Sequence, residues 1–200
     1  MKSILLTGTD VGKPAQQGAV EQHANGYQIT AGGADIWGTS DEFHFAFSRH
    51  TGDFDLTVRL EALSIADLYT KAGIMGRESL DADSPHVYFM VFPDNSPRNK
   101  NNGGYEFQYR EVKGGESAAI YPPDYTSMPP EFPVSYPQTW LRLERKGNQF
   151  RAWYSAEGCD WRLFAEKALE LSHSIFLGFA VTSHNENETV TAQFMDITLN

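Results

Sequence analysis

Cysteine is almost absent from this chain of 200 residues, which has Cys159 alone. One cysteine excludes an internal disulfide and a cysteine-rich zinc site, and the neighbouring Gly158 predicts that Cys159 lies in a turn. Long apolar runs are also missing, since no stretch approaches the roughly 18 apolar residues of a membrane-spanning helix. The opening residues, MKSILLTG, lack the apolar core and cleavage site of a signal peptide. We therefore expect a soluble cytoplasmic chain, or a secreted one if a leader has been removed.

Positive charge is scarce: 16 Lys and Arg residues stand against 26 Asp and Glu residues, for a net charge of -10. Nucleic acids and anionic membranes attract proteins through a positive field, so this balance argues against both partners. With a sequence pI near 5.0 we also expect anionic polysaccharides to be poor ligands, unless Lys71, Arg77 and Arg110 converge in one place.

Short alternating segments dominate what is present. Residues 54–63, FDLTVRLEAL, alternate apolar and polar side chains, as a half-buried strand does. The segment 86–92, HVYFMVF, is apolar on both faces and is expected in the centre of a sheet. The only expected helix is short, at 163–171. Ten strands are expected, at 27–30, 41–47, 54–63, 69–78, 86–92, 105–110, 140–145, 150–154, 176–183 and 190–199.

These elements predict an all-β fold, an antiparallel β-sandwich or barrel, with at most one short helix. The length suits a single domain over residues 1–200. The longest irregular segment, 114–138, is rich in proline, which breaks both helices and strand ladders. Because it also contains Tyr121, Tyr125 and Tyr136, we expect it to form an ordered flap.

The stretch 32–47, GGADIWGTSDEFHFAF, combines a glycine turn, an isolated Asp35, an indole at Trp37 and an alternating strand. Phe43, Phe45 and Phe47 are expected to face the core. Glu42 and His44 lie on the other face of that strand, where solvent or a ligand is expected.

Several segments together resemble the DUF1349 family of the concanavalin A-like lectin/glucanase superfamily, whose second name comes from a yeast regulator of enolase. They are DVGKPAQQG, GGADIWGTSDEFHFAF, GDFDLTVRLE, KAGIMGRESL, WLRLERKGN with AWYSAEGCDW, and GFAVTSHN with TAQFMDITL. The match is collinear over nearly the whole chain. The resemblance implies a β-sandwich jelly roll of the kind often found beside carbohydrate-active modules. It implies no catalytic motif, so its support for function is by analogy.

A jelly roll of this type has a concave sheet that can hold a sugar chain. Sugars are recognised by aromatic faces, which cover the C–H side of the ring, and by planar polar groups, which bond to the hydroxyls. The aromatic candidates are Trp37, Tyr69, Tyr88, Trp140 and Trp161, and the polar candidates are His44, Lys71, Arg77, His86, Gln108, Arg110 and His184. If the strands that carry Arg77 and Arg110 share a sheet, both arginines are expected in one groove.

Each of these residues also has a simpler interpretation. Trp153 and Phe150 are typical of a buried hairpin, and Trp161 after a turn is more often a hydrophobic plug than a platform. Arg77 beside Glu78 is as well explained by an ion pair between strands. The histidines have neither H-x-H nor H-E-x-x-H spacing, which argues against catalytic zinc.

An enzyme on this fold needs two carboxyl groups across a glycosidic bond. The catalytic strand of laminarinase-like relatives reads E-x-D-x-x-E, and this chain has no such run. Glu42, Glu78 and Glu106 remain candidates only if they meet across strands. Structural calcium is a further possibility, because calcium takes 6–8 oxygen ligands. Oxygen donors are frequent at Asp35, Asp41, Glu186, Glu188 and Asp196, of which Asp35 and Asp196 are the candidate metal ligands.

The sequence therefore favours a carbohydrate-binding module that is not catalytic. A glycoside hydrolase on the same fold and a module that binds a protein partner remain open. Two carboxyls at catalytic spacing would favour the hydrolase. An exposed apolar patch in place of a groove would favour the protein partner.

Overall fold

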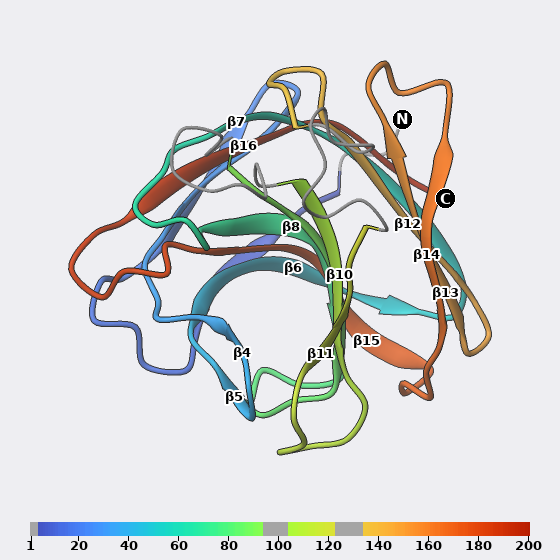
Figure 1. Cartoon of the computed structure of the whole chain (residues 1–200), viewed down its shortest axis with the longest axis horizontal. Helices are drawn as coiled ribbons and strands as arrows, with labels where there is room; N and C mark the ends of the chain where they lie inside the picture. Colours follow the sequence, from blue (N-terminus) through green and yellow to red (C-terminus); the bar gives the residue numbers. More distant parts are fainter. Residues whose placement is uncertain (1–3, 94–103, 123–133) are drawn as a thin grey trace.

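The computed structural model describes residues 4–93, 104–122 and 134–200, and in these ranges all regular structure is β-strand. Two seven-stranded antiparallel sheets pack face to face, and a two-stranded ribbon lies beside them (Figure 1). The first sheet has the order β1(Thr7–Val11), β6(Phe43–Thr51), β15(Ser174–Thr182), β8(Lys71–Arg77), β9(His86–Phe92), β10(Gly104–Arg110) and β11(Ala118–Ile120). The second has the order β14(Arg162–Ala168), β13(Gln149–Ser155), β12(Trp140–Lys146), β7(Phe54–Leu63), β16(Val190–Leu199), β3(Gly26–Ala31) and β2(Ala19–His23). The ribbon pairs β4(Ile36–Trp37) with β5(Ser40–Asp41).

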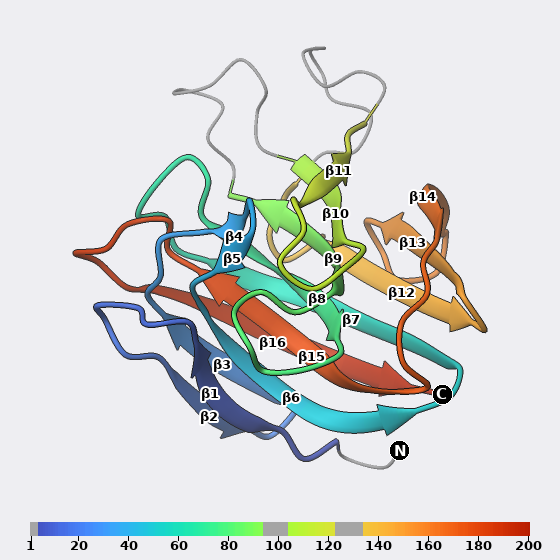
Figure 2. The same ribbon diagram turned by 90° about the horizontal axis from the view of Figure 1, so that it is seen from below.

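The chain order mixes local hairpins with long crossovers. Strand β15 lies between β6 and β8, and β16 lies between β7 and β3, so late strands complete both sheets. The axes of strands β6 and β15 of one sheet are roughly aligned with those of β7 and β16 of the other (Figure 2). This is the aligned packing of a β-sandwich, and it confirms the predicted fold class.

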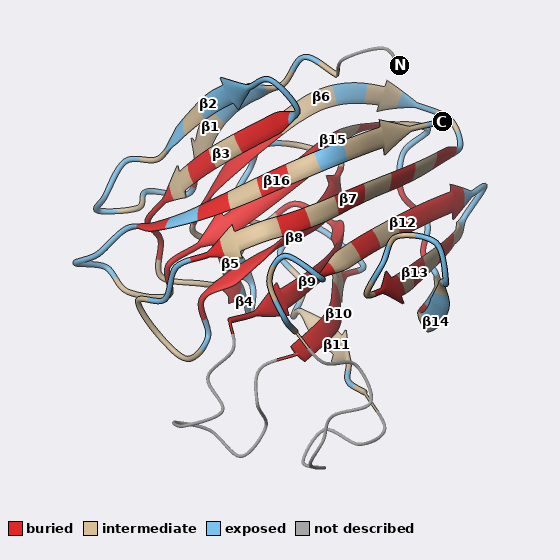
Figure 3. Ribbon diagram, turned by 90° about the horizontal axis from the view of Figure 1, so that it is seen from above, coloured by how far each residue is buried: buried red, intermediate tan, exposed pale blue. Residues whose placement is uncertain are grey.

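Alternation places the main core between the sheets. Along β7, Leu56, Val58 and Leu60 are buried while the residues between them are partly exposed. Phe179 of β15 stacks on Phe194 of β16 with ring centroids 4.5 Å apart, which joins the two sheets directly. Strands β8 and β9 are buried along their whole length (Figure 3), as the continuous apolar run in β9 predicts.

A second apolar cluster lies on the outer face of the first sheet. It is built from Phe43, Phe45, Met75, Tyr88 and Met90, and from Ile36 of the β4–β5 ribbon. The ribbon thus covers part of a face that a simple sandwich leaves open, and this covering decides where a ligand can reach the sheet.

Two sequence expectations need correction or lie outside the described residues. The predicted helix at 163–171 is wrong: residues 162–168 form β14, an edge strand paired with β13. Tyr125 of the expected flap lies within 123–133, outside the described residues. The described residues form no helix long and apolar enough to cross a membrane.

Candidate functional site

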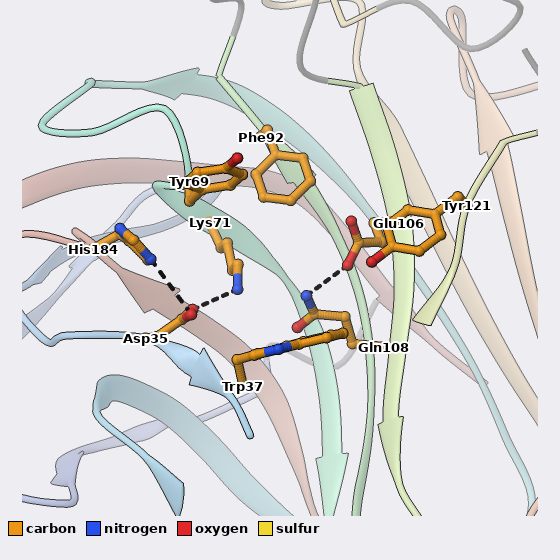
Figure 4. Close-up of a pocket in the computed structure, with 9 residues that line it drawn as sticks. All are labelled: Asp35, Trp37, Tyr69, Lys71, Phe92, Glu106, Gln108, Tyr121 and His184. Atoms are coloured by element: carbon orange, nitrogen blue, oxygen red, sulfur yellow. Dashed lines mark hydrogen bonds and ion pairs between the residues drawn. The ribbon is translucent and has the colours of Figure 1, made fainter. Parts of the chain in front are cut away.

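A pocket of about 300 Å³ opens on the outer face of the first sheet, beside the β4–β5 ribbon (Figure 4). Five of the predicted ligand-binding residues line it, together with a candidate catalytic and a candidate metal-binding carboxyl. The lining residues are Asp35, Trp37, Tyr69, Lys71, Phe92, Glu106, Gln108, Tyr121 and His184.

The strand register explains why these side chains meet. Strands β8, β9 and β10 are neighbours, and their outward residues fall into rows across the sheet. One row joins Met75, Tyr88 and Gln108, and the next joins Met90 to Glu106. The expectation that the two predicted polar strand faces share one sheet is confirmed.

One wall of the pocket is a charged network centred on Asp35. Lys71 Nζ lies 2.5 Å from Asp35 Oδ1, and His184 Nε2 lies 3.4 Å from Asp35 Oδ2. His184 Nδ1 also lies 3.0 Å from Asp67 Oδ1, and His184 has a left-handed backbone with φ of 55°. Burial acts to raise the pKa of Asp35, but the His184 hydrogen bond and the Lys71 charge outweigh it and lower that pKa. The hydrogen bond to Asp35 in turn raises the pKa of His184.

The opposite wall is formed by Glu106 and Gln108 of β10. Both side chains are buried, and Gln108 Nε2 donates a hydrogen bond of 2.6 Å to Glu106 Oε1. Burial raises the pKa of Glu106 to about 7, although Gln108 and Lys71 act in the other direction. Gln108 Oε1 is buried and has no hydrogen-bond partner among the described residues. Such an atom at the wall of an open pocket is prepared to accept a hydrogen bond from a ligand.

Aromatic side chains surround these polar groups. In Figure 4, Trp37 lies on one side of the pocket and Tyr69 and Phe92 on the other, with the ammonium of Lys71 between them. Tyr69 contacts Phe92 edge-on, with centroids 6.0 Å apart, and lies against His184 at 5.3 Å. Trp37, Tyr69 and Tyr121 are 37%, 44% and 48% exposed, so their rings are available to a ligand.

The other end of the same sheet face is closed. Arg77, His86 and Arg110 form the next row, but all three are fully buried around Asp41. Arg110 Nη2 lies 2.7 Å from Asp41 Oδ1, and Arg77 Nη1 lies 3.3 Å from Asp41 Oδ2. The expectation that these two arginines line a groove is corrected, because the ribbon brings Asp41 onto them and excludes a ligand. Burial lowers the pKa of His86 to about 4, so the ring is neutral in this cluster.

Tyr88 and His44 also lie outside the pocket lining. Tyr88 is fully buried, and its hydroxyl donates to the carbonyl of Ala180 at 2.9 Å. His44 is 4% exposed, so the face of β6 expected to meet solvent or ligand is covered. Gly18 lies against the His44 ring, and Asp10 of the paired strand β1 places its Oδ1 2.7 Å from His44 Nδ1.

The remaining tryptophans gather on the second sheet. Trp140 lines a separate cavity of about 650 Å³, and its ring is perpendicular to that of Trp161 at 6.5 Å. Gly158 lies against the Trp140 ring, where an added Cβ would come within 2.8 Å. Sequence reasoning had grouped Trp140 with residues that lie on the other sheet.

The candidate carboxyls Glu42, Glu78 and Glu106 do not share the pocket. Glu106 lines the pocket, whereas Glu78 accepts hydrogen bonds from the backbone and hydroxyl of Ser172. Glu42 is not among the lining residues. The expected ion pair between Arg77 and Glu78 is replaced by the pairing of Arg77 with Asp41. The second carboxyl of the pocket is Asp35.

Metal binding receives no support from these positions. Asp35 is paired with Lys71, and Asp196 accepts a hydrogen bond of 2.7 Å from Arg59 Nε. Over residues 4–93, 104–122 and 134–200, no group of three or more His, Cys, Asp or Glu side chains is arranged to hold a metal ion.

Sequence reasoning missed Phe92 and Tyr121 as pocket residues. Phe92 has the same parity along β9 as His86 and Tyr88, so the alternation already placed it on the outer face. Tyr121 belonged to the tyrosine-containing flap and follows β11 directly.

Comparison with known proteins finds relatives in structure alone. No family model matches the chain, and no curated protein matches it, so the DUF1349 resemblance is not confirmed at the level of the family. A functionally unknown protein from Saccharomyces cerevisiae is 18% identical with a TM-score of 0.72, covering 96% of this chain and 95% of that chain.

Two further neighbours carry named binding activities. The carbohydrate-binding module CBM66 from Bacillus subtilis is 16% identical with a TM-score of 0.57, covering 96% of this chain and 94% of that one. The exoplasmic/lumenal domain of VIP36, in its Ca²⁺/Man3GlcNAc-bound form, is 9% identical with a TM-score of 0.56, covering 98% and 83%. At these identities the likeness shows the fold, a concanavalin A-like jelly roll.

Proposed function

We propose that this chain binds carbohydrate in the pocket between the β4–β5 ribbon and strands β8 to β10. The observation that carries the proposal is the combination of exposed rings with a buried polar floor. Trp37 and Tyr69 can cover the apolar side of a sugar ring, while Gln108 offers a buried acceptor that has no partner in the described part of the chain. A purely structural cluster would satisfy that acceptor within the protein.

The structural neighbours support the same proposal by analogy. One is a carbohydrate-binding module and another is a sugar-bound domain on the same sandwich. Membership of the DUF1349 family is part of this proposal, and it rests on the sequence segments named above.

A glycan-array screen of the full chain, with calcium and again with chelator, tests the proposal. We expect binding of at least one glycan, and loss of about tenfold in affinity in Trp37→Ala, which corresponds to ~1.4 kcal/mol. Leu163→Ala is the matched control, because Leu163 is 47% exposed on β14 of the other sheet. An array without any binding would overturn the proposal and favour a protein partner, for which a pull-down is the next experiment.

Glycoside hydrolysis is the second candidate function. One observation favours it: the pocket raises the pKa of Glu106 to about 7 and lowers that of Asp35. Carboxyls with opposed pKa shifts in one site are the usual arrangement of an acid and its partner. If this function holds, bound oligosaccharides are cleaved, and Glu106→Gln stops cleavage without stopping binding. Intact oligosaccharides after long incubation with the wild type would exclude it.

A further inference from the structure

The wall formed by Glu106 and Gln108 restricts which chemical groups of a ligand can bind against it. The side-chain amide of Gln108 is held by its hydrogen bond to Glu106 Oε1, so its carbonyl oxygen Oε1 is fixed in orientation. That oxygen is buried and unpartnered among the described residues. A ligand group that only accepts hydrogen bonds, such as a carboxylate or a sulfate, would leave it unpaired at a cost of ~1–3 kcal/mol. A hydroxyl group satisfies it.

The protonation of Glu106 depends on the groups that face it from neighbouring elements. Strand β8 contributes Lys71, the segment before β4 contributes Asp35, β9 contributes Tyr88 and β10 contributes Gln108. Lys71 is the only cation among them, and its ammonium is engaged by Asp35 Oδ1 at 2.5 Å and by the carbonyl of Ile36 at 3.2 Å. Within residues 4–93, 104–122 and 134–200, Glu106 therefore has no cation as a direct partner to favour its charged form.

We infer that the ligand of this pocket is an uncharged sugar with two neighbouring hydroxyls, which bind to Gln108 Oε1 and to the carboxyl of Glu106. The first hydroxyl donates to Gln108, and the second accepts the proton of Glu106. Ligand binding then requires the neutral form of Glu106, so that binding takes up a proton when Glu106 is ionised. This inference rests on the proposed carbohydrate binding and adds its charge class and its dependence on pH.

Uronates and sulfated sugars are disfavoured by the same contacts. Their anionic group would approach Asp35 and the acceptor of Gln108, while the charge of Lys71 is already balanced by Asp35. Arg77 and Arg110, which would have made the site positive, are buried on Asp41. The condition under which anionic polysaccharides would bind, convergence with Lys71, is therefore not met in the pocket.

The test is calorimetric titration of the full chain with neutral probes, namely cellotetraose, mannotetraose, xylotetraose and an inulin-type fructan, with polygalacturonate as the anionic counterpart. Because the pKa of Glu106 is about 7, we expect affinity for a neutral probe to fall about tenfold between about pH 6 and about pH 8. Glu106→Gln presents a neutral donor at every pH, so its affinity is expected to stay constant over that interval. Glu21→Gln, on the exposed strand β2, is the control and should behave as the wild type.

The outcomes separate the two proposals. Binding of a neutral probe by the wild type with the same affinity at both pH values would overturn this inference and leave the carbohydrate-binding proposal standing. The inference is also overturned, with the carbohydrate-binding proposal left standing, if Glu106→Gln loses affinity with rising pH as the wild type does. The titrating group would then be His184. Tighter binding of polygalacturonate than of the neutral probes also overturns it. Failure of every probe, neutral and anionic, counts against both proposals.

Discussion

Asp41 forms buried ion pairs with the guanidinium groups of Arg77 and Arg110. It is fully buried, as are Arg77 and Arg110, and burial lowers the pKa of Arg77 to about 10 despite the attraction of Asp41. Removing one partner of a buried ion pair leaves an uncompensated charge, which costs ~3–5 kcal/mol. We therefore expect Asp41→Asn to lower the free energy of unfolding by that amount, measured by urea denaturation.

The control for this prediction is an exposed ion pair. Lys113 Nζ lies 2.6 Å from Asp81 Oδ2, and both side chains are mostly exposed. Exposed pairs contribute little, so Lys113→Ala should leave the urea midpoint nearly unchanged. Equal effects of the two substitutions would contradict the view that burial makes Asp41 important.

Glu106 makes the stability of the protein depend on pH in a way that can be measured without a ligand. Its pKa is raised from 4.5 to about 7, so the folded state keeps a proton that the unfolded chain releases. Its contribution is therefore fully present below about pH 4.5 and is lost as the pH rises through about 7. Relative to the wild type, Glu106→Gln should gain about 3 kcal/mol over this interval. A constant difference between the two proteins across the interval would contradict the raised pKa.

Individual pocket residues were predictable from the sequence only as far as their strand faces. Alternation correctly placed Lys71 with Arg77, and Gln108 with Arg110, on shared faces. It could not say that one end of this surface is covered, because the covering residue, Asp41, comes from a segment far away in the sequence. Open and closed ends of one sheet face have the same local pattern.

At the scale of the element, the two glycines of β8 have different roles. An added Cβ at Gly73 would come within 2.2 Å of the Phe89 carbonyl oxygen on β9, so the neighbouring strand leaves no room there. At Gly76 the nearest atom is 3.1 Å away and is the end of the Ile175 side chain, which can move. The pairing of β8 with both neighbours is continuous, so Gly73 marks a close approach of β9 and not a bulge.

This difference predicts unequal effects of the same substitution. Gly73→Ala should lower the free energy of unfolding by ~1–3 kcal/mol, because the backbone of β9 must shift. Gly76→Ala, on the same strand, should have a clearly smaller effect. Thermal denaturation of both variants compares them, and equal losses would contradict the account based on contact with β9.

Strand β14 shows where local reasoning fails. The segment 163–171, LFAEKALEL, which overlaps β14, includes good helix formers, and its apolar spacing suits a helix as well as a strand. Pairing with β13 decides the outcome: Ala165 is buried against the sheet while Leu163 is exposed at the edge. Tertiary pairing overrides propensity in such short segments.

At the scale of the whole molecule, acid stability reflects a balance between groups whose pKa values are shifted in different ways. Burial lowers the pKa of His86 from 6.5 to about 4, so only the unfolded chain takes up its proton in that interval and acidification destabilises the fold. Glu106 acts in the opposite sense between about pH 7 and 4.5. Below 3.8 the lowered pKa of Asp35 adds a further loss as the pH falls.

We therefore expect the thermal midpoint of the wild type to change little between about pH 6.5 and 4.5 and to fall below that. In Glu106→Gln the opposing contribution is absent, so the midpoint should already fall with acidification from about pH 6.5. Scanning calorimetry over a pH series distinguishes the two profiles. Parallel profiles would show that these two groups do not set the balance.

The architecture as a whole was more predictable than the site. Each of the ten expected strand segments overlaps a strand of the structure, and the ranges for β7, β9 and β16 agree fully. The short strands β2, β4, β5 and β11 carry too little alternation to be recognised, and β4 and β5 are the ones that shape the pocket. The positions of such elements depend on tertiary contacts and not on the local pattern.

In the β4–β5 ribbon the backbone makes the contacts that hold the ribbon in place, and several side chains remain exposed. The carbonyl oxygen of Gly38 accepts hydrogen bonds from Arg110 and from the Ser117 amide, which fixes the tip of the ribbon. The side chains of Trp37, Thr39 and Ser40 are exposed and take no part in that fixing. A combinatorial library at residues 37, 39 and 40 would therefore change the exposed side chains beside the pocket, while the backbone contacts that hold Gly38 stay in place.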